Sequence, residues 1–296
     1  MTIPAVPVPP APVQPASAPI NVAKKDVQWH YDLSTLFYRL LWGPHIHHGL
    51  WNPGHFDESP NIAQVRLTET LAKSAGIVSG ETVIDIGCGM GGSTIWLAKH
   101  GCTATGVTLS PFQRRWAANS AAWHGVSRKT TFLRADAEAV EFPAGSADVV
   151  WSIECTEHLF DKPRFFQRAG EWLKPGGRFA ICAWLAGPEP RSPEHQKQVA
   201  DVCQGMVCPS LGTANDYKAW FDAAGLDTVE EFDWTERVAQ TWEICLKRVN
   251  RTGVRYLAHL IDKNSVEFIK AFPMILDAYR SGAMRYGAFI ARKRGG

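Results

Sequence analysis

The sequence predicts an α/β fold in which helices flank a mostly parallel sheet. Three observations lead to this prediction. Short apolar runs alternate with helical segments between residues 82 and 184, which is typical of a parallel sheet. A glycine-rich loop directly follows the first apolar run. The 296 residues, 45% hydrophobic and 20% charged, can bury a large core without disulfides or metals.

The N-terminal region is expected to contain a tail and a cap. Residues 1–22 alternate proline with alanine and valine, and we expect a disordered tail because proline removes backbone donors and favours extended, solvated chain. Residues 23–75 are rich in aromatic residues and carry leucines at helical spacing, so they predict a helical cap that ends with a helix over Gln64–Ala75. Residues 23–296 are expected to form a single domain.

The central region predicts five strands with helices between them. The strands are expected at Thr82–Ile86, Thr103–Thr108, Thr130–Arg134, Ala147–Ile153 and Arg178–Trp184. The helices are expected at Ser93–His100, Pro111–His124 and Lys162–Leu173, the second with proline at its favoured first position. A turn at Lys174–Gly177 is expected before the fifth strand.

The C-terminal third predicts a helix over Asn215–Ala224 and two further strands, Asp227–Trp234 and a hairpin-like Met284–Arg292. Residues 186–214 are rich in Pro, Gly and polar residues and are expected to be irregular, whereas residues 236–283 are expected to be mostly helical. We expect both segments to be lid insertions.

The composition argues against several classes of protein. A net charge of +2 without a long run of one sign gives no indication of a nucleic-acid partner. Seven scattered cysteines without a Cys-x-x-Cys pair indicate a reducing compartment, and the N-terminus does not read as a secretion signal, so a cytoplasmic location is expected. No apolar run reaches the length of a membrane span. Association with a membrane surface and the oligomeric state stay open.

The glycine loop Gly87–Gly92 satisfies G-x-G-x-x-G between a strand and a helix, where backbone can approach a ligand closely. A dinucleotide site would place an acid at the end of the second strand to hold a ribose, and the residue there is Thr108. NAD and FAD are therefore disfavoured. Asp85 precedes the loop, and a carboxylate beside glycine backbone suits a zwitterionic ligand that carries a sulfonium.

The segment Asp85-Ile86-Gly87-Cys88-Gly89 resembles the first motif of class I S-adenosylmethionine-dependent methyltransferases. The resemblance implies a Rossmann-like sheet of seven strands, S-adenosyl-L-methionine as the cofactor, and a glycine loop that wraps its methionine part while Asp85 holds the loop and the cofactor's ammonium. Asp136-Ala137 follows the third strand, where the family places an acid against the adenine amino group. Val150–Ser152 ends the fourth strand, where acceptor and methyl group meet, and Leu173–Gly177 is similar to the family's "L-K-P-G-G" turn.

Further segments resemble one branch of this family. Gly106–Gln113 is similar to the "G-[VLI]-T-[LI]-S-x-x-Q" of tocopherol methyltransferases, coclaurine-type N-methyltransferases and cyclopropane fatty-acid synthases. This implies that Gln113 holds the nucleoside and that Thr108 offers a hydroxyl to the ribose in place of the family's usual carboxylate. Tyr31–Ser34 and Trp42–Gly49 are similar to N-terminal motifs of the tocopherol enzymes. The implied cofactor-binding residues are Asp85, Gly87, Cys88, Gly89, Thr108, Leu109, Gln113, Asp136, Ala137 and Tyr31.

Four histidines of the cap, His45, His47, His48 and His55, could be taken for a metal cluster. Zinc sites use tighter, paired spacings with a second pair elsewhere, so we expect no metal and a loop that closes over the cofactor. His48 falls near the position of a bicarbonate-binding cysteine in the cyclopropane synthases, which weakens the case for a bicarbonate-dependent synthase.

The segment Trp151–His158 is similar to the "V-W-S-x-E-x-x-E-H" of tocopherol methyltransferases. It places Glu154, Glu157 and His158 at the pole where open α/β sheets bind ligands. We expect His158 to be the general base, since the unperturbed pKa of histidine is about 6.5. Glu157 would fix its tautomer or offset its charge, and Glu154 would hold a polar group of the acceptor or the cofactor. His47 and His48 are rival bases.

The sequence therefore predicts an S-adenosylmethionine-dependent methyltransferase that acts on a small, partly lipophilic acceptor. The closest resemblance implies a tocopherol-like prenylated phenol, methylated on a ring carbon. The alternatives are N-methylation of an alkaloid-like amine, methylation of an isoprenoid alkene, and a non-catalytic module that binds S-adenosyl ligands.

Overall fold

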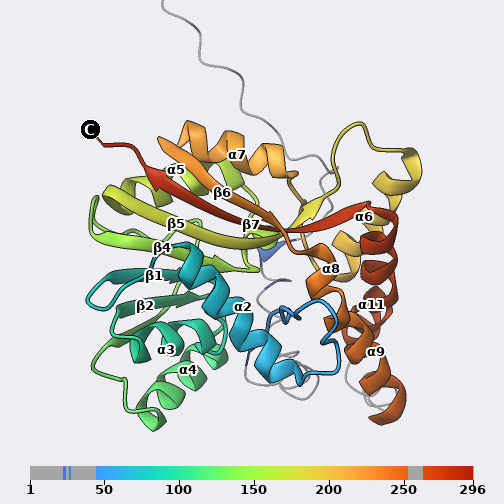
Figure 1. Cartoon of the computed structure of the whole chain (residues 1–296), viewed down its shortest axis with the longest axis horizontal. Coiled ribbons are helices and arrows are strands. Elements are labelled where there is room, and N and C mark those ends of the chain that lie inside the picture. Colours follow the sequence, from blue (N-terminus) through green and yellow to red (C-terminus); the bar gives the residue numbers. More distant parts are fainter. Residues whose placement is uncertain (1–22, 25–26, 28–44, 253–262, 296) are drawn as a thin grey trace, which may run out of the picture.

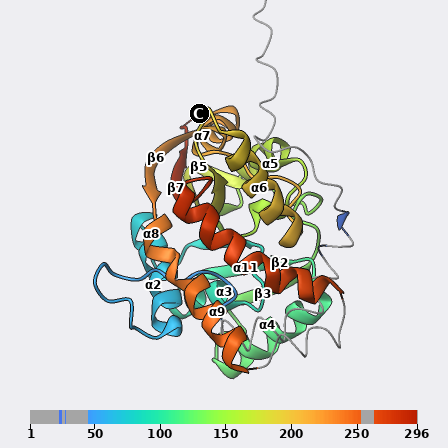
Figure 2. The ribbon, with the colours of Figure 1, turned by 90° about the vertical axis from the view of Figure 1, so that its right-hand side faces the viewer.

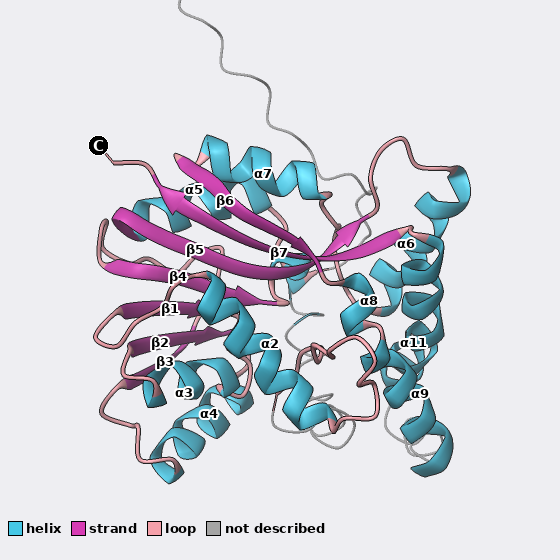
Figure 3. Ribbon diagram, in the orientation of Figure 1, coloured by secondary structure: helices cyan, strands magenta, loops and turns pink. Residues whose placement is uncertain are grey.

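Seven strands form one sheet in the order β3-β2-β1-β4-β5-β7-β6, shown in Figures 1 and 3. The computed structural model describes residues 23–24, 27, 45–252 and 263–295. Strands β1 to β5 are parallel, and β7 lies antiparallel between β5 and β6. The expected seven-stranded, mostly parallel Rossmann-like sheet is therefore confirmed. The strands are β1 Thr82–Ile86, β2 Thr103–Thr108, β3 Thr130–Arg134, β4 Ala147–Ile153, β5 Leu173–Ala186, β6 Leu226–Asp233 and β7 Met284–Lys293.

Helices cover both faces of the sheet (Figure 1). In β4, Val149 and Trp151 pack into the core beneath α2 and α3, whereas Val150 packs on the opposite side with α5 and α7. A parallel strand buried on both faces needs consecutive apolar residues, which Val149-Val150-Trp151 provide in the middle of β4. The described helices are α2 Pro60–Ser74, α3 Gly92–Lys99, α4 Pro111–Trp123, the 3₁₀ turn η1 Thr156–His158, α5 Lys162–Trp172, α6 Pro193–Gly205, α7 Ala214–Ala223, α8 Thr235–Val238, α9 Gln240–Thr252 and α11 Lys263–Ser281.

Two expectations about the chain after β4 were wrong. The expected turn at Lys174–Gly177 lies inside β5, because Leu173 already pairs with Ala147 and a register shift absorbs the glycines. Part of the segment expected to be irregular is the helix α6. The side chain of Ser192 caps α6 by accepting from the backbone N–H of His195, and Pro193 occupies its first turn.

The cap and the lid are described only in part. The expected disordered tail over residues 1–22, and Tyr31 in the expected cap, lie outside the described residues. The C-terminal insertions pack together, since α6 and α9 both contact α11 (Figure 2). Their role as a lid stays a prediction. No helix among the described residues is long and apolar enough to cross a membrane.

Candidate active site

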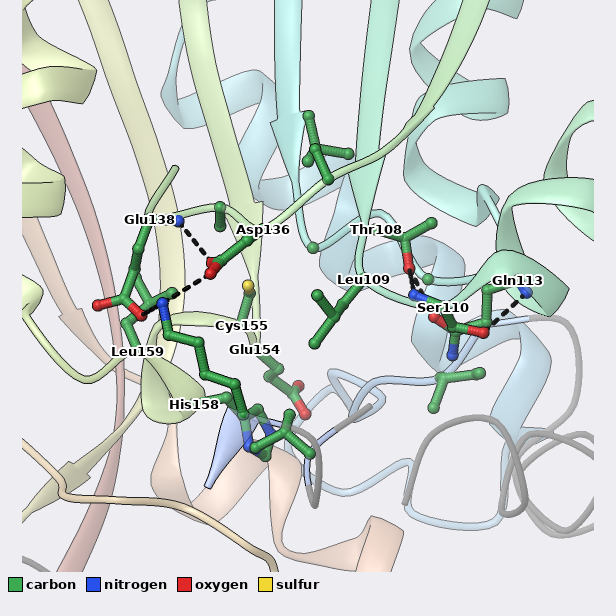
Figure 4. Close-up of a pocket in the computed structure, with 18 of the residues that line it drawn as sticks. Thr108, Leu109, Ser110, Gln113, Asp136, Glu138, Glu154, Cys155, His158 and Leu159 are labelled. Atoms are coloured by element: carbon green, nitrogen blue, oxygen red, sulfur yellow. Dashed lines mark hydrogen bonds and ion pairs between the residues drawn. The ribbon is translucent and has the colours of Figure 1, made fainter. Parts of the chain in front are cut away.

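A pocket opens at the carboxyl ends of the strands, beside the point where the strand order reverses between β1 and β4. Open α/β sheets bind ligands at such a point because the neighbouring loops diverge there. Figure 4 shows its lining, drawn from the loops after β1, β2, β3 and β4. The expected site residues that line it are Gly87, Gly89, Thr108, Leu109, Gln113, Asp136, Ala137, Glu154 and His158. Asp85 and Cys88 line a smaller cavity that shares Gly87 and Gly89 with the pocket.

The glycine loop is held against two strands. The backbone N–H groups of Gly87 and Cys88 both donate to the carbonyl of Val107 at the end of β2, each over 2.9 Å. Gly87 has a φ of 79°, and a Cβ built there would lie 2.3 Å from the Cβ of Cys155 after β4. Only glycine fits both constraints, so the loop lies close enough to β4 to form one wall with it.

Asp85 lies at the end of β1 and is 2% exposed. It accepts a hydrogen bond of 2.6 Å from the hydroxyl of Thr94. Burial raises the pKa of Asp85 to about 7, although the hydrogen bonds from Thr94 oppose this shift. A buried carboxyl group next to open glycine backbone fits the ammonium end of a zwitterion, because a cation would offset the cost of its ionised form.

The opposite end of the pocket carries groups suited to a nucleoside. The hydroxyl of Thr108 donates to the side-chain oxygen of Gln113 over 2.8 Å, and Ser110 caps α4 by accepting from the backbone N–H of Gln113 over 3.1 Å. Asp136 Oδ1 accepts from the backbone N–H of Glu138 over 2.9 Å. The expected Thr108 and Gln113 are therefore positioned together, with Asp136 on the same pocket (Figure 4).

Lys24 is a pocket residue that the sequence did not reveal. Its Nζ lies 2.6 Å from Asp136 Oδ2 and 2.8 Å from Glu138 Oε2. It thus covers the carboxylate expected to meet the adenine. A single lysine in a segment expected to be a cap belongs to no motif, so no signal in the sequence pointed to it.

Glu154 follows β4 and is fixed by four donors. It accepts from the backbone N–H and the Nδ1 of His48, both at 2.9 Å. It also accepts from the hydroxyl of Tyr286 at 2.7 Å and the indole N–H of Trp184 at 3.2 Å. Burial alone would raise the pKa of Glu154, but His48, His47 and Tyr286 together lower it to about 2. Its φ of 53° is unusual for a residue other than glycine and indicates a strained backbone held by these contacts.

His48 is enclosed by aromatic rings and is 1% exposed. The ring centroids of Trp184, Trp242, Tyr279 and Tyr286 lie 5.6, 5.2, 6.1 and 5.0 Å from its own. Its Nε2 lies 3.5 Å from the hydroxyl of Tyr279. The pair of His48 and Glu154 therefore anchors the cap loop to the carboxyl end of β4.

His158 and Glu157 face different surroundings. His158 Nδ1 lies 3.2 Å from the carbonyl oxygen of Val207, and burial lowers the pKa of His158 to about 4. Glu157 accepts from the backbone N–H of Trp184 through Oε1, while its buried Oε2 has no hydrogen-bond partner among the described residues. Burial raises the pKa of Glu157 to about 8. The contact that sets the tautomer of His158 thus comes from Val207, whereas the sequence suggested Glu157.

Lys162 holds the turn that carries these two residues, and sequence reasoning missed it. Its buried Nζ donates to the carbonyl of Leu159 over 2.6 Å, to the hydroxyl of Ser210 over 3.1 Å and to the carbonyl of Glu157 over 3.4 Å. Burial lowers the pKa of Lys162 to about 8. In the sequence it was simply the first residue of an expected helix.

The cap histidines do not gather around a common point. His47 Nε2 lies 3.2 Å from His45 Nδ1, and His47 Nδ1 lies 2.8 Å from the carbonyl oxygen of His48. His45 and His47 line the small cavity beside Asp85. Within the described ranges, no group of three or more His, Cys, Asp or Glu side chains is arranged to hold a metal ion.

Known proteins resemble the chain over most of its length. A methyltransferase domain family matches residues 61–231. The chloroplastic tocopherol O-methyltransferase of Arabidopsis thaliana is 30% identical, covering 95% of this chain and 85% of the relative. A probable chloroplastic tocopherol O-methyltransferase of Oryza sativa subsp. japonica is 29% identical, covering 91% and 78%. The crystal structure of the [4+2]-cyclase SpnF superposes with a TM-score of 0.81 at 23% identity, covering 95% of this chain and 99% of that one. The chain belongs to the methyltransferase family and is an S-adenosylmethionine-dependent methyltransferase.

Proposed function

We propose that this methyltransferase methylates a ring carbon of a small, partly lipophilic phenol of the tocopherol type. The observation that carries the proposal is the 30% identity to a tocopherol O-methyltransferase across 95% of the chain, which includes the cap and lid segments. The lining of the pocket supports it, because Ile153, Leu159 and Phe160 provide apolar walls next to His158.

The residues of the pocket fit S-adenosylmethionine from end to end. We assign Asp85 and the loop Gly87–Gly89 to the methionine part, Thr108 and Gln113 to the ribose, and Asp136 with Ala137 to the adenine; Cys88 and Leu109 would complete the walls. When bound, the cofactor supplies an electrophilic methyl group on its sulfonium. The protein supplies alignment and electrostatics.

We assign the general base to His158. Of the three candidate histidines, His158 lines the pocket at the carboxyl ends of the strands, and His47 lines the smaller cavity. His48 is enclosed by the rings of Trp184, Trp242, Tyr279 and Tyr286. If His158 donates from Nδ1 to the carbonyl of Val207, its acceptor nitrogen is Nε2. With a pKa near 4 the imidazole is neutral at physiological pH and can accept a phenolic proton as the methyl bond forms.

Glu154 and Glu157 take supporting roles in this proposal. Glu154 already satisfies four donors of the protein, so we assign it to positioning the cap over the acceptor. Glu157 Oε1 accepts from the backbone N–H of Trp184, so we assign Glu157 to positioning the turn that carries His158.

The test is a turnover assay with three classes of acceptor. The full chain is incubated with S-adenosylmethionine and prenylated phenols, alkaloid-like amines or isoprenoid alkenes, and mass spectrometry locates the new methyl group. We expect methylation on the ring carbon of the phenols. A matched phenol whose ring positions next to the hydroxyl are already methylated should not react. An ether product, or turnover of amines or alkenes alone, would overturn the proposed acceptor. Binding of S-adenosylmethionine without any turnover would favour the non-catalytic alternative.

A further inference from the structure

The segment from Ile86 to Ala135 contains no acidic residue. It covers most of the α3–β2–α4–β3 quarter of the sheet and carries Lys99, Arg114, Arg115, Arg128, Lys129 and Arg134. The whole chain has 31 Lys and Arg against 29 Asp and Glu, so acidic residues outnumber basic ones outside this segment. All six basic residues except the half-buried Arg114 are exposed. Among the residues that the structure describes, none of the six forms an ion pair.

Helix α4 in this quarter has an unusual distribution of apolar side chains. Its buried face is built from small or polar residues, Gln113, Ala117 and Ala121. Its largest apolar residues point outward: Trp123 is 88% exposed and Trp116 is 40% exposed. We call Phe112, Trp116 and Trp123 the aromatic ridge. At about 100° per residue these three positions fall within about 40° of one another on the helix.

The aromatic ridge begins at the active site. The ring of Phe112 lies 6.1 Å from that of Trp116, centroid to centroid, and the next residue after Phe112 is the pocket residue Gln113. Arg115 is exposed within the same helix, and Arg128 and Lys129 follow in the loop before β3. Figure 2 shows α4 at the outer surface of the molecule. Exposed indole rings and basic side chains thus extend along α4 and the following loop, from Phe112 beside the pocket to Lys129 before the start of β3.

We propose that the aromatic ridge and the surrounding basic residues dock the enzyme on an anionic lipid bilayer. Tryptophan prefers the interface between water and hydrocarbon because its ring is apolar and its N–H is polar. Arginine and lysine beside an amphipathic helix are attracted to anionic headgroups, and the absence of acids over residues 86–135 leaves that attraction unopposed within the segment. The indole of Trp123 is 88% exposed, which suits insertion between headgroups rather than capture of a peptide in a groove. This inference does not depend on which acceptor is methylated.

The test uses the full chain and vesicles without acceptor, so its outcome is separate from that of the turnover assay. Sedimentation is compared for vesicles of phosphatidylcholine alone and vesicles with about 30% phosphatidylglycerol. We expect binding to the anionic vesicles to be at least about 10-fold stronger, and to be largely lost in about 0.5 M salt because the charges are then screened.

Paired variants locate the binding surface. Trp116→Ser with Trp123→Ser should weaken binding to anionic vesicles by about 10-fold or more, because the apolar anchor is removed. The matched control is Lys218→Gln with Val229→Ser, which removes a partly exposed cation on α7 and the side chain of a residue on β6 that is 51% exposed, since β6 is the opposite edge of the sheet from β3. Melting temperatures of both double variants establish that they are folded. Equal binding to both kinds of vesicle, no vesicle binding, or unchanged binding by the tryptophan variant would overturn the proposal. Retention on heparin without vesicle binding would also overturn it, by indicating a general polyanion site.

Discussion

Replacing Glu154 by glutamine tests how the cap is held on the sheet. Glu154 accepts from four donors and lies in a buried pair with His48, whose side chain is 1% exposed. The neutral amide has one acceptor oxygen and turns an N–H₂ group toward donors. The pKa of Glu154 in the wild type gives the size of the stabilisation that this substitution would remove. A shift from 4.5 to about 2 corresponds to about 3 kcal/mol of stability. Breaking a buried pair by removing one partner costs about 3–5 kcal/mol, which is the same magnitude.

The assay is urea unfolding at several pH values. A carboxyl group with a lowered folded-state pKa stabilises the protein above its unfolded-state value and loses that effect as pH falls through the folded-state value. The difference between wild type and Glu154→Gln should therefore be full at pH 7 and shrink between pH 4.5 and about 2. The control is Glu230→Gln on the exposed side of β6, which should change stability by less than about 0.5 kcal/mol. A loss below about 1 kcal/mol for Glu154→Gln at pH 7 would show that the four contacts do not hold the carboxylate as described.

Three other changes probe the pocket. Asp85→Asn should weaken S-adenosylmethionine binding measured by calorimetry, because the ammonium group of the cofactor requires the ionised carboxylate. For the same reason, the affinity of the wild type should fall about 10-fold per pH unit below pH 7. A wild-type affinity that does not change with pH would contradict this. His158→Ala should slow single-turnover methyl transfer by about 10²-fold or more with cofactor affinity little changed, and an unaffected rate would reject His158 as the base. Gly87→Ala should destabilise the protein more than Gly89→Ala in thermal unfolding, because a Cβ at Gly87 would lie 2.3 Å from the Cβ of Cys155, whereas nothing lies within 4 Å of one at Gly89. Equal losses would indicate that only the positive φ matters at both positions.

Local patterns in the sequence were sufficient for the sheet. The first four strands have the residue boundaries expected from the sequence. Strands β1, β2 and β4 are largely buried, whereas the edge strand β3 buries only Phe132. The expectation failed at α6, where a high content of proline and polar residues suggested a loop. The capping sequence Ser192-Pro193-Glu194 was a helix start signal within it. At β5, pairing between Leu173 and Ala147 overrode the glycine turn.

Motifs identified which residues face the pocket, but spacing could not show their partners. Glu154 and His48 were each singled out in the sequence, yet their contact joins positions 106 apart. The ion pair of Lys24 with Asp136 spans 112 positions and belongs to no motif. Such contacts depend on how the cap folds back over the sheet, and one sequence contains no local pattern for that.

The carboxyl groups of the site differ in what already neutralises them, and this difference separates structural roles from ligand-binding ones. Glu154 accepts from two groups of His48 and from Trp184 and Tyr286, and the pKa of Glu154 falls to about 2. Among the described residues, Asp85 accepts hydrogen bonds from the neutral Thr94, and burial raises the pKa of Asp85 to about 7. As pH rises from about 4 to 7, ionising Asp85 in the folded chain costs about 4 kcal/mol relative to the unfolded chain, because no cation in the described part of the chain compensates the buried carboxylate. A bound ammonium group at Asp85 would offset that cost. A cation bound at Glu154 would add little stabilisation, because His48 and the other donors already compensate the charge of Glu154. Glu154, after β4, therefore binds the cap, whereas Asp85, on the neighbouring strand β1, stays available to bind the ligand.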